Sequence, residues 1–302
     1  DQGVAQVGTI SGTSISFGAE GVFSSIGVDN TAICYDSSAN KVVVSWYEAV
    51  SNIIEVAVGT ISSTSISFGT AAATVSSSSN HDHRIVYDVN ANKSLIIYKN
   101  NSGYGTAAVV SVSGTTVTIG TEAVFVSEGV SDVAAVYDSS NNKTLIIWRK
   151  ASNNYGAGIV ATISGTGVTF GTEAVLASEA MFNFACSFDS TVNKTIVAFY
   201  TNSSGHSKSS QATISGTGVA FSSLTTYATS STTYNALAYD PDSARTVFAY
   251  SDPGSSITGT SLLYSATSSA TNLTSENYIG ISDAAYSNGA TATIQLVGTV
   301  DD

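Results

Sequence analysis

The chain has 302 residues, of which 43% are hydrophobic and 11% charged, and its formal net charge is −12 at pH 7. A phosphate backbone or an anionic membrane attracts a basic face, and the ten Lys and Arg residues are scattered singly, so composition argues against both partners. The sequence has no apolar run long enough to span a bilayer. It also shows no signal peptide and no initiator Met, and we expect a processed chain or a fragment.

Two strings of the sequence recur every 51 residues or so. The first is ISGTSISFG at 10–18, which returns in related forms at 61–69, 112–120, 163–171 and 214–222. The second is YDSSNNKTLIIW at 137–148, with counterparts at 35–46, 87–98, 188–199 and 239–250. Repetition at this period is typical of solenoids, arrays and propellers.

Taken in chain order, the predicted elements are all β-strands. The first two are VAQVGTIS at 4–11 and SISFGAEGVF at 14–23, and the last two are IGISDAAY at 279–286 and TATIQLVG at 291–298. Between them lie five full units, each with four short β-branched and aromatic runs bounded by Gly, Asn, Asp and Ser. In the third unit we expect strands at 133–138, 144–150 and 159–164, and a single fourth strand that begins at Val168 and continues through GTEA.

Four antiparallel strands in about 40 to 50 residues form one blade of a β-propeller. The sequence therefore predicts an all-β fold, a six-bladed β-propeller that is a single domain over residues 1–302. The last blade is expected to combine two C-terminal with two N-terminal strands, which would leave no free sheet edge. The predicted blades are approximately 28–75, 80–126, 131–177, 182–228, 233–275, and 276–302 with 1–23.

A repeated Asp opens the turn between the first and second strands of each unit, and most of these turns carry Asn before a Lys. The positions are Asp36, Asp88, Asp138, Asp189 and Asp240, with Asn40, Asn92, Asn142 and Asn193. One reading is a calcium site in each turn, but a single Asp supplies too few oxygen ligands. We favour the other reading, in which Asp accepts bonds from backbone amides and Asn adopts a left-handed conformation.

Two aromatic columns and two cysteines are best explained by packing. The columns are Trp46, Tyr98, Trp148, Phe199 and Tyr250, and Tyr35, Tyr87, Tyr137, Phe188 and Tyr239. An aromatic residue at one fixed position of every blade usually packs between blades. Cys34 and Cys186 fall on opposite blades of the predicted ring, so we expect no disulfide between them.

Catalytic and metal-binding patterns are weak. His81 and His83 have the i, i+2 spacing of two ligands on one side of a strand, but His206 lies two units away, so we expect no metal site and no cofactor. Sialidases use an arginine cluster, and the chain's Arg84, Arg149 and Arg245 are not expected to meet. We therefore predict a protein that is not an enzyme. Paired carboxylates in a cleft would favour a glycosidase instead.

The copies differ from one another mainly in two sets of loops. These are the second-to-third strand loops and the fourth-to-first connections, which a propeller would place on one face, called here the varied face. A varied face on a constant scaffold suits recognition, although loops also differ where nothing constrains them. The candidate ligand contacts on this face are Tyr47, His81, His83, Tyr104, Arg149, Tyr155, Phe182 and His206.

The unit YDSSNNKTLIIWRK … YGAGIVATISGTGVTFGTEAV resembles propeller-like repeats of marine tailed-phage virion proteins and of related marine bacterial surface proteins. The C-terminal ENYIGISDAAYSNGATATIQLVGTVDD is similar to a segment of such virion proteins. The resemblance implies an extracellular or virion location and a binding or structural role, and it transfers no active site. We expect a phage tail or fibre component that recognises a host-surface glycan or contacts other virion proteins. The alternatives are a secreted or cell-surface lectin-like protein of a marine bacterium and, less favoured, a glycosidase.

Overall fold

The computed structural model describes residues 2–48, 50–74, 82–253, 258–265, 281–282 and 294–295. The chain divides into two compact units, Asp1–Ala266 and Thr267–Asp302. The elements of the described residues are β-strands, and these residues include no helix of the length and hydropathy that would cross a membrane. The predicted all-β class is therefore confirmed.

In the first unit each copy of the repeat builds an antiparallel sheet, numbered here 1 to 5 in chain order. Sheet 1 contains β5 (Val28–Asp36), β6 (Lys41–Glu48), β7 (Ile53–Ser62), β8 (Ser65–Phe68) and β9 (Ala72–Ala73). Sheet 2 contains β10 (His83–Asp88), β11 (Lys93–Lys99), β12 (Tyr104–Ser113) and β13 (Thr116–Ile119). Sheet 3 contains β15 (Lys143–Lys150), β16 (Tyr155–Ser164) and β17 (Gly167–Phe170). Sheet 4 contains β19 (Lys194–Thr201), β20 (His206–Ser215), β21 (Gly218–Phe221) and β22 (Thr225–Ala228). Sheet 5 contains β23 (Thr233–Asp240), β24 (Arg245–Asp252) and β25 (Thr258–Tyr264).

Two long strands each belong to two sheets. The first half of β14 (Ala123–Asp138) pairs with β12 in sheet 2, and its second half pairs with β15 in sheet 3. β18 (Ala174–Asp189) joins sheets 3 and 4 in the same way. The connections 127–132 and 178–183, which we predicted to be loops, are therefore strands. Along β14 and β18 the main-chain hydrogen bonds to one sheet are followed directly by hydrogen bonds to the next sheet, so the backbone stays extended between them.

The predicted single fourth strand is wrong in one respect, because it is broken in the middle. In sheet 3 it consists of β17 and the first half of β18, with Gly171 between them. An ideal Cβ on Gly171 would lie 1.7 Å from the Thr217 carbonyl oxygen of sheet 4. The same contact joins Gly18 to Thr64, Gly69 to Thr115 and Gly120 to Thr166. At this repeated position the absence of a side chain allows the turn of the following sheet to pack directly against the backbone.

The N-terminal strands form a half-sheet that copies the outer half of sheet 2. These strands are β1 (Gly3–Ala5), β2 (Gly8–Ser11), β3 (Ser14–Phe17) and β4 (Gly21–Ser24). Their pairs Gly3↔Ser24, Val4↔Val22 and Ala5↔Gly21 have the register of Gly105↔Val126, Thr106↔Val124 and Ala107↔Ala123. Residues 3–24 are therefore third and fourth strands without first and second strands of their own in the described part of the first unit.

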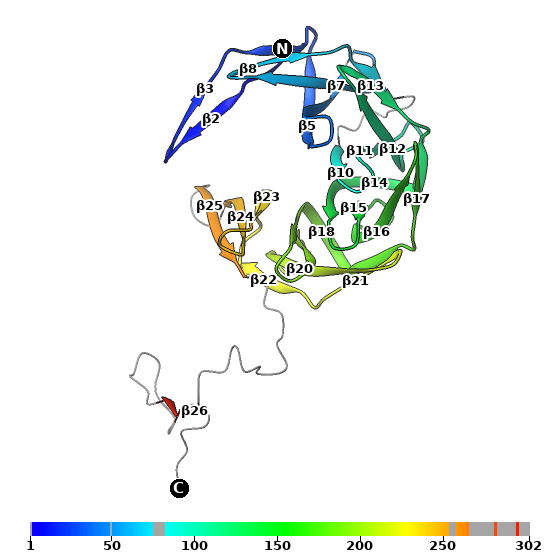
Figure 1. Cartoon of the computed structure of the whole chain (residues 1–302). Helices are drawn as coiled ribbons and strands as arrows, with labels where there is room; N and C mark the ends of the chain where they lie inside the picture. The colour runs from blue at the N-terminus through cyan, green and yellow to red at the C-terminus, as the bar shows by residue number, and fades with distance from the viewer. Residues whose placement is uncertain are drawn as a thin grey trace. The chain divides into compact units, whose positions relative to one another are not determined.

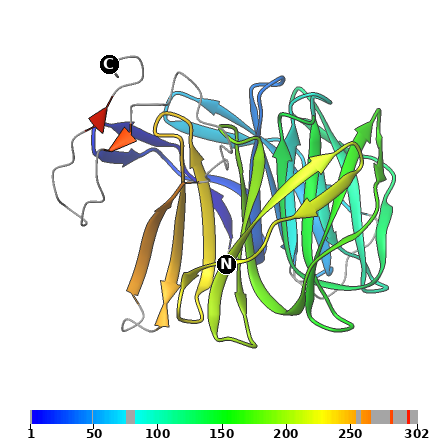
Figure 2. The same ribbon diagram turned by 90° about the horizontal axis from the view of Figure 1, so that it is seen from below.

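The sheets of the first unit follow one another in an arc around a common axis, which the described part leaves open between β2–β3 and β25 (Figure 1). The first strands β5, β10, β14, β18 and β23 lie on the inner side, each against the next. Seen from the side, the hairpin turns gather at opposite ends of the sheets (Figure 2).

The core lies between neighbouring sheets, as the aromatic column predicted. Trp46, Tyr98, Trp148, Phe199 and Tyr250 are all buried. Trp148, for example, packs with Phe125 of the preceding sheet at 5.1 Å between ring centroids. The tyrosines of the other column reach across sheets, since the Ser38 amide donates to the Tyr87 hydroxyl at 3.2 Å and the Asn90 amide to the Tyr137 hydroxyl at 3.3 Å.

The turn prediction is confirmed by the bonds of Asp138. Its Oδ1 accepts from the backbone amides of Ser140 at 2.9 Å and Asn141 at 3.0 Å, and its carboxylate is buried. The Asn positions have positive φ, namely Asn40 (54°), Asn92 (53°), Asn142 (53°) and Asn193 (52°). Cys34 and Cys186 are both free thiols.

In the second unit the described strands are β26 (Ile281–Ser282) and β27 (Ile294–Gln295), which pair antiparallel. They fall within the two strands predicted for 279–286 and 291–298. The predicted last blade, built from two C-terminal and two N-terminal strands, falls largely on residues outside the described ones.

Candidate functional site

The two sets of varied loops lie together, as the sequence predicted. The Ala151 amide of a second-to-third loop donates to the Gly129 carbonyl of a fourth-to-first connection at 2.9 Å. The Met181 amide donates to the Asn154 carbonyl at 2.9 Å in the same manner. The loop of sheet 3 is therefore bonded to the connections on both sides of it.

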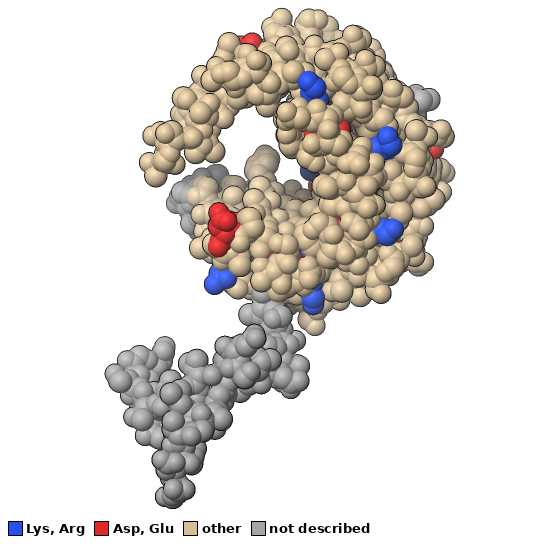
Figure 3. All heavy atoms as spheres, in the orientation of Figure 1, with Lys and Arg blue, Asp and Glu red and all other residues tan. Residues whose placement is uncertain are grey.

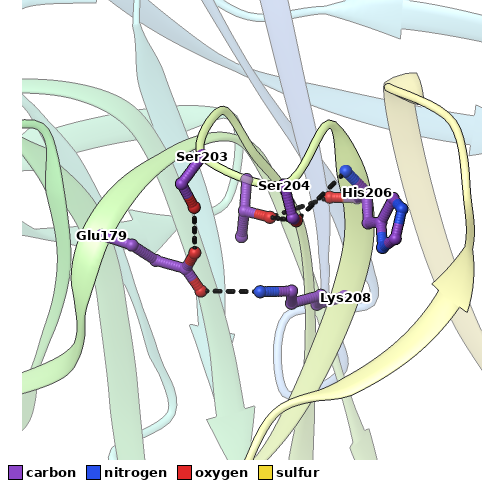
Figure 4. A network of polar contacts seen from close by, with 6 residues as sticks. Glu179, Ser203, Ser204, His206 and Lys208 are labelled. Atoms are coloured by element: carbon purple, nitrogen blue, oxygen red, sulfur yellow. Dashed lines mark hydrogen bonds and ion pairs between the residues drawn. The ribbon is translucent and has the colours of Figure 1, made fainter.

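Carboxylates fix parts of this surface from one sheet to the next. Glu179 accepts from Ser203 Oγ at 2.5 Å and from Lys208 Nζ at 2.9 Å, beside the turn in which the His206 amide donates to Ser204 Oγ (Figure 4). Partial burial raises the pKa of the Glu179 carboxyl, but the bonds from Ser203 and Lys208 outweigh it, and the pKa is lowered overall. Loops held in this way present their side chains in fixed positions.

A left-handed bulge recurs in the first strand of several sheets, six residues before the turn Asp. Its residues are Asn30 (φ 42°), Asp132 (φ 51°), Asn183 (φ 57°) and Tyr234 (φ 54°). At each of them the register of the first strand against the second shifts. A β-bulge bends its strand and re-aims a side chain relative to the sheet.

Four side chains at this position line one pocket at the axis, called here the axial pocket. They are Asp82, Asp132, Asn183 and Tyr234, and the cavity of about 200 Å³ is completed by Arg84, Phe184 and Asn235. A second cavity of about 160 Å³ shares Arg84, Phe184 and Asn235 with the first and reaches Cys186. Burial raises the pKa of the Cys186 thiol to about 12, although Arg84 acts in the opposite direction, so this wall is a neutral thiol.

The acidic side of the axial pocket is held by main-chain and guanidinium bonds. Asp82 Oδ2 accepts from the Asp132 amide at 2.9 Å, and Arg149 Nε lies 2.7 Å from Asp132 Oδ2. Arg149 also donates to Asn154 Oδ1 at 2.6 Å, and its guanidinium carbon lies 4.8 Å from the ring centroid of Phe182. The bonds fix the positions of both carboxylates.

The other side of the axial pocket is held by a hydroxyl network around Asn235. Asn235 Oδ1 accepts from Tyr227 OH at 3.1 Å and from Thr232 Oγ1 at 2.9 Å. Its Nδ2 donates to the Asn183 carbonyl at 2.9 Å. Thr232 is fully buried and bonds Ser207 Oγ at 2.8 Å. The carboxamide therefore has a fixed orientation.

The structure brings together two of the predicted ligand contacts, Arg149 and Phe182, and Arg149 also pairs with Asp132 of the axial pocket. Tyr104, Tyr155 and His206 begin the third strands of sheets 2, 3 and 4, and the Tyr104 side chain is 37% exposed. Tyr47 and His83 are 2% and 1% exposed, so neither offers a surface to a ligand. His81 lies outside the described residues.

The sequence reasoning missed Asp82, Asp132, Asn183, Tyr234 and Asn235. A signal for the bulge existed, since Asn or Asp stands six residues before the turn Asp in most copies, and these residues tolerate left-handed backbone. Within the part of the chain that the structure describes, no group of three or more His, Cys, Asp or Glu is placed to bind a metal ion. Lys and Arg are spaced singly on the face seen in Figure 3 and form no basic patch there.

Comparison with known proteins identifies the fold class but no family. No family model matches the chain, and no curated protein matches it. Solved structures do match. AofleA from Arthrobotrys oligospora has a TM-score of 0.51 at 10% identity, over 78% of this chain and 68% of that one. The fucose-specific lectin from Aleuria aurantia has a TM-score of 0.50 at 13% identity, over 80% of this chain and 77% of that one.

An exo-β-1,3-galactanase from Phanerochaete chrysosporium aligns with a TM-score of 0.49 at 10% identity, over 78% of this chain. The chain spans 59% of the length of that galactanase. At such identities the likenesses bear on the fold alone: the chain shares an all-β architecture with the two proteins named first.

Proposed function

We propose that the protein is a non-enzymatic carbohydrate-binding module whose ligand enters the axial pocket on the varied face. The observation that carries the proposal is the recurrent left-handed bulge, which directs Asp132, Asn183 and Tyr234 into one cavity. Bulges re-aim side chains and are over-represented next to active sites, and here three of them contribute side chains to the same cavity.

The chemistry of the pocket suits a sugar. Carboxylates accept hydrogen bonds from hydroxyls, while Asn and Arg donate to hydroxyl and ring oxygens. Tyr234 is 87% exposed and offers an aromatic face for the apolar face of a pyranose ring. The cavity of about 200 Å³ is below the range of about 300 Å³ and more for drug-sized ligands, which favours a single sugar ring.

Glycan-array binding by the wild-type protein and by Tyr234→Asn tests this function. Asn keeps the left-handed backbone of position 234 but removes the ring, so binding should fall while the melting temperature stays the same. Val89→Asn is the control, because it also replaces an exposed apolar side chain by Asn, in a first-to-second strand turn away from the pocket. Equal binding by all three proteins would count against the axial pocket, and no binding to any glycan would reject the function.

A glycosidase is the second candidate, favoured by the presence of two carboxylates, Asp82 and Asp132, in one pocket. It predicts release of reducing ends from a polysaccharide, abolished by Asp82→Asn or Asp132→Asn. Such a result would reject the non-enzymatic proposal. Glycan binding without turnover in the wild type and both variants would support the non-enzymatic proposal.

For the architecture we propose six blades, the last formed by residues 276–302 together with the N-terminal half-sheet. The half-sheet has the register of complete sheets and exposes apolar side chains, among them Ile10 at 77% and Phe17 at 64%. If the termini share a blade, deletion of 1–12 and deletion of 276–302 should each lower the melting temperature, and the double deletion should cost less than their sum. A truncation of 1–12 that leaves the melting temperature unchanged would contradict this closure.

For the biological setting we propose an extracellular or virion role, as a phage tail or fibre component that binds a host-surface glycan. Its support is the sequence resemblance of the repeat. The alternative is a secreted or cell-surface lectin of a marine bacterium. Binding of the labelled protein to marine bacterial cells, with competition by the glycans found on the array, tests the host-surface partner.

A further inference from the structure

Resting on the proposed carbohydrate-binding function, we propose that the axial pocket has a donor wall at Asn235 and an acceptor wall at Asp82 and Asp132, and that these walls select a neutral sugar ring over a uronic acid. The donor and acceptor walls are inferred from the hydrogen bonds and ion pairs that fix Asn235, Asp82 and Asp132.

The orientation of the Asn235 carboxamide is set by three partners. The Asn183 carbonyl can only accept, so the atom 2.9 Å from it is the amide nitrogen. Tyr227 and Thr232 place their hydroxyls 3.1 and 2.9 Å from the opposite atom, as donors to Oδ1. Burial raises the pKa of Tyr227, which keeps its hydroxyl protonated and able to donate. The Asn183 carbonyl therefore decides the orientation, because a flipped Asn235 would place Oδ1 against that carbonyl oxygen and lose the bond.

An amide nitrogen carries two hydrogens, and the bond to Asn183 uses one. Among the described residues the second N–H of Asn235 has no recorded acceptor, and the side chain lines both cavities. Arg84 lines the same two cavities and adds further donors, of which one is taken by the His83 carbonyl at 2.7 Å. This side of the pocket therefore offers N–H groups and requires an acceptor oxygen from the ligand.

Asp82 and Asp132 offer acceptors on the other side. A ligand that contacts both walls has hydroxyls that donate to the carboxylates and an oxygen that accepts from Asn235. The hydroxyls and ring oxygen of one neutral pyranose satisfy both conditions.

The charges of the pocket disfavour an anion. The lining holds two carboxylates, Asp82 and Asp132, against one guanidinium, Arg84, and Arg149 pairs with Asp132 at 2.7 Å. A ligand carboxylate would add a third negative charge to this pocket and would face like charge beside Asp82. A uronic acid should therefore bind more weakly than the neutral sugar of the same configuration.

The test measures dissociation constants by NMR titration for matched pairs of probes: galactose with galacturonic acid, glucose with glucuronic acid, and mannose with mannuronic acid. At least one neutral member should bind, and about tenfold more tightly than its uronate, which corresponds to about 1.4 kcal/mol. A uronate that binds as tightly as its neutral partner, or more tightly, would overturn the inference.

Three variants assign the selectivity to the walls. Asn235→Asp keeps an acceptor for Tyr227 and Thr232 but loses the N–H, and should weaken the neutral sugar about fivefold or more. Asp82→Asn removes one negative charge and should reduce the preference over the uronate. If Asn235→Asp does not fold, Tyr227→Phe serves instead: it releases one of the two hydroxyls on Oδ1 and should weaken the neutral sugar with unchanged circular dichroism.

The outcomes separate this inference from the function on which it rests. Glycan-array binding that none of these variants changes would leave the carbohydrate function standing and remove the two-wall pocket. A wild-type protein that binds no glycan on the array and none of the monosaccharides would remove both.

Discussion

The glycine that interrupts the fourth strand in sheets 1, 2 and 3 gives the sharpest structural prediction. At Gly171 a methyl group would lie 1.7 Å from the Thr217 carbonyl oxygen and 2.7 Å from its carbon, both backbone atoms of the next sheet. Real Cβ contacts are not shorter than 3.0 Å, so Gly171→Ala must move two sheets apart by more than about 1 Å. Overpacking of this kind costs about 1–3 kcal/mol.

For a domain of this size such a loss corresponds to a melting temperature lower by about 2–4 °C per kcal/mol, and so by about 2–12 °C in total. Differential scanning calorimetry measures this directly. Gly167→Ala is the matched control, since its Cβ would meet nothing closer than the Ser164 carbonyl oxygen at 3.8 Å and its φ is not in the left-handed region. If the two variants melt at the same temperature, the turn of sheet 4 does not depend on Gly171 and the proposed reason for the repeated glycine is wrong.

Three further predictions concern the turns, the loops and the surface aromatics. Asp138→Ala should lower the free energy of unfolding by about 1–3 kcal/mol by urea denaturation, because buried amides lose a charged acceptor, and a change below 0.5 kcal/mol would contradict the capping role. The pKa of Glu179 is lower in the folded than in the unfolded state, so its contribution is present above the ordinary Glu pKa and is lost as pH falls through the folded value. Glu179→Gln should therefore flatten the acid side of the stability–pH curve, and an unchanged curve would refute this. Tyr104→Ala with Tyr155→Ala should weaken glycan or cell binding at an unchanged melting temperature if the ligand extends over the loops, and unchanged binding would confine the ligand to the axial pocket.

The sequence predicted those features that depend on one residue type at one repeated position. Asp138 caps its turn and Trp148 packs between sheets because a carboxylate beside free amides and a large ring between apolar strands have few other uses. The same reasoning failed for the fourth strand. VTFGTEAV has strand composition throughout, and the break at Gly171 depends on a carbonyl group 46 residues later in the chain.

The candidate site was predicted less well, because a pocket depends on register and not on composition. In the sequence, Asp132 and Asn183 are ordinary polar residues. In the structure, a one-residue register shift between the first and second strands directs their side chains inward. The sequence predicts Arg149 and Phe182 as two separate ligand contacts, whereas in the structure the Arg149 guanidinium lies over the Phe182 ring. Tyr47 and His83 were predicted as ligand contacts but are buried. An aromatic or imidazole ring near the end of a strand can face either the loops or the core, and the sequence does not distinguish the two.

The two-sheet strands β14 and β18 make the unit of duplication different from the unit of structure. Cutting the chain at the boundaries between sheets would divide each strand of this kind at the point where its hydrogen bonds pass from one sheet to the next. An ancestral single copy could not have satisfied both halves of such a strand without a neighbour. A repeat of this design is stable as an array from the start, and recombination that adds or removes copies preserves the fold when its breakpoints lie in the hairpin turns, such as Gly114–Thr115, rather than in the shared strands.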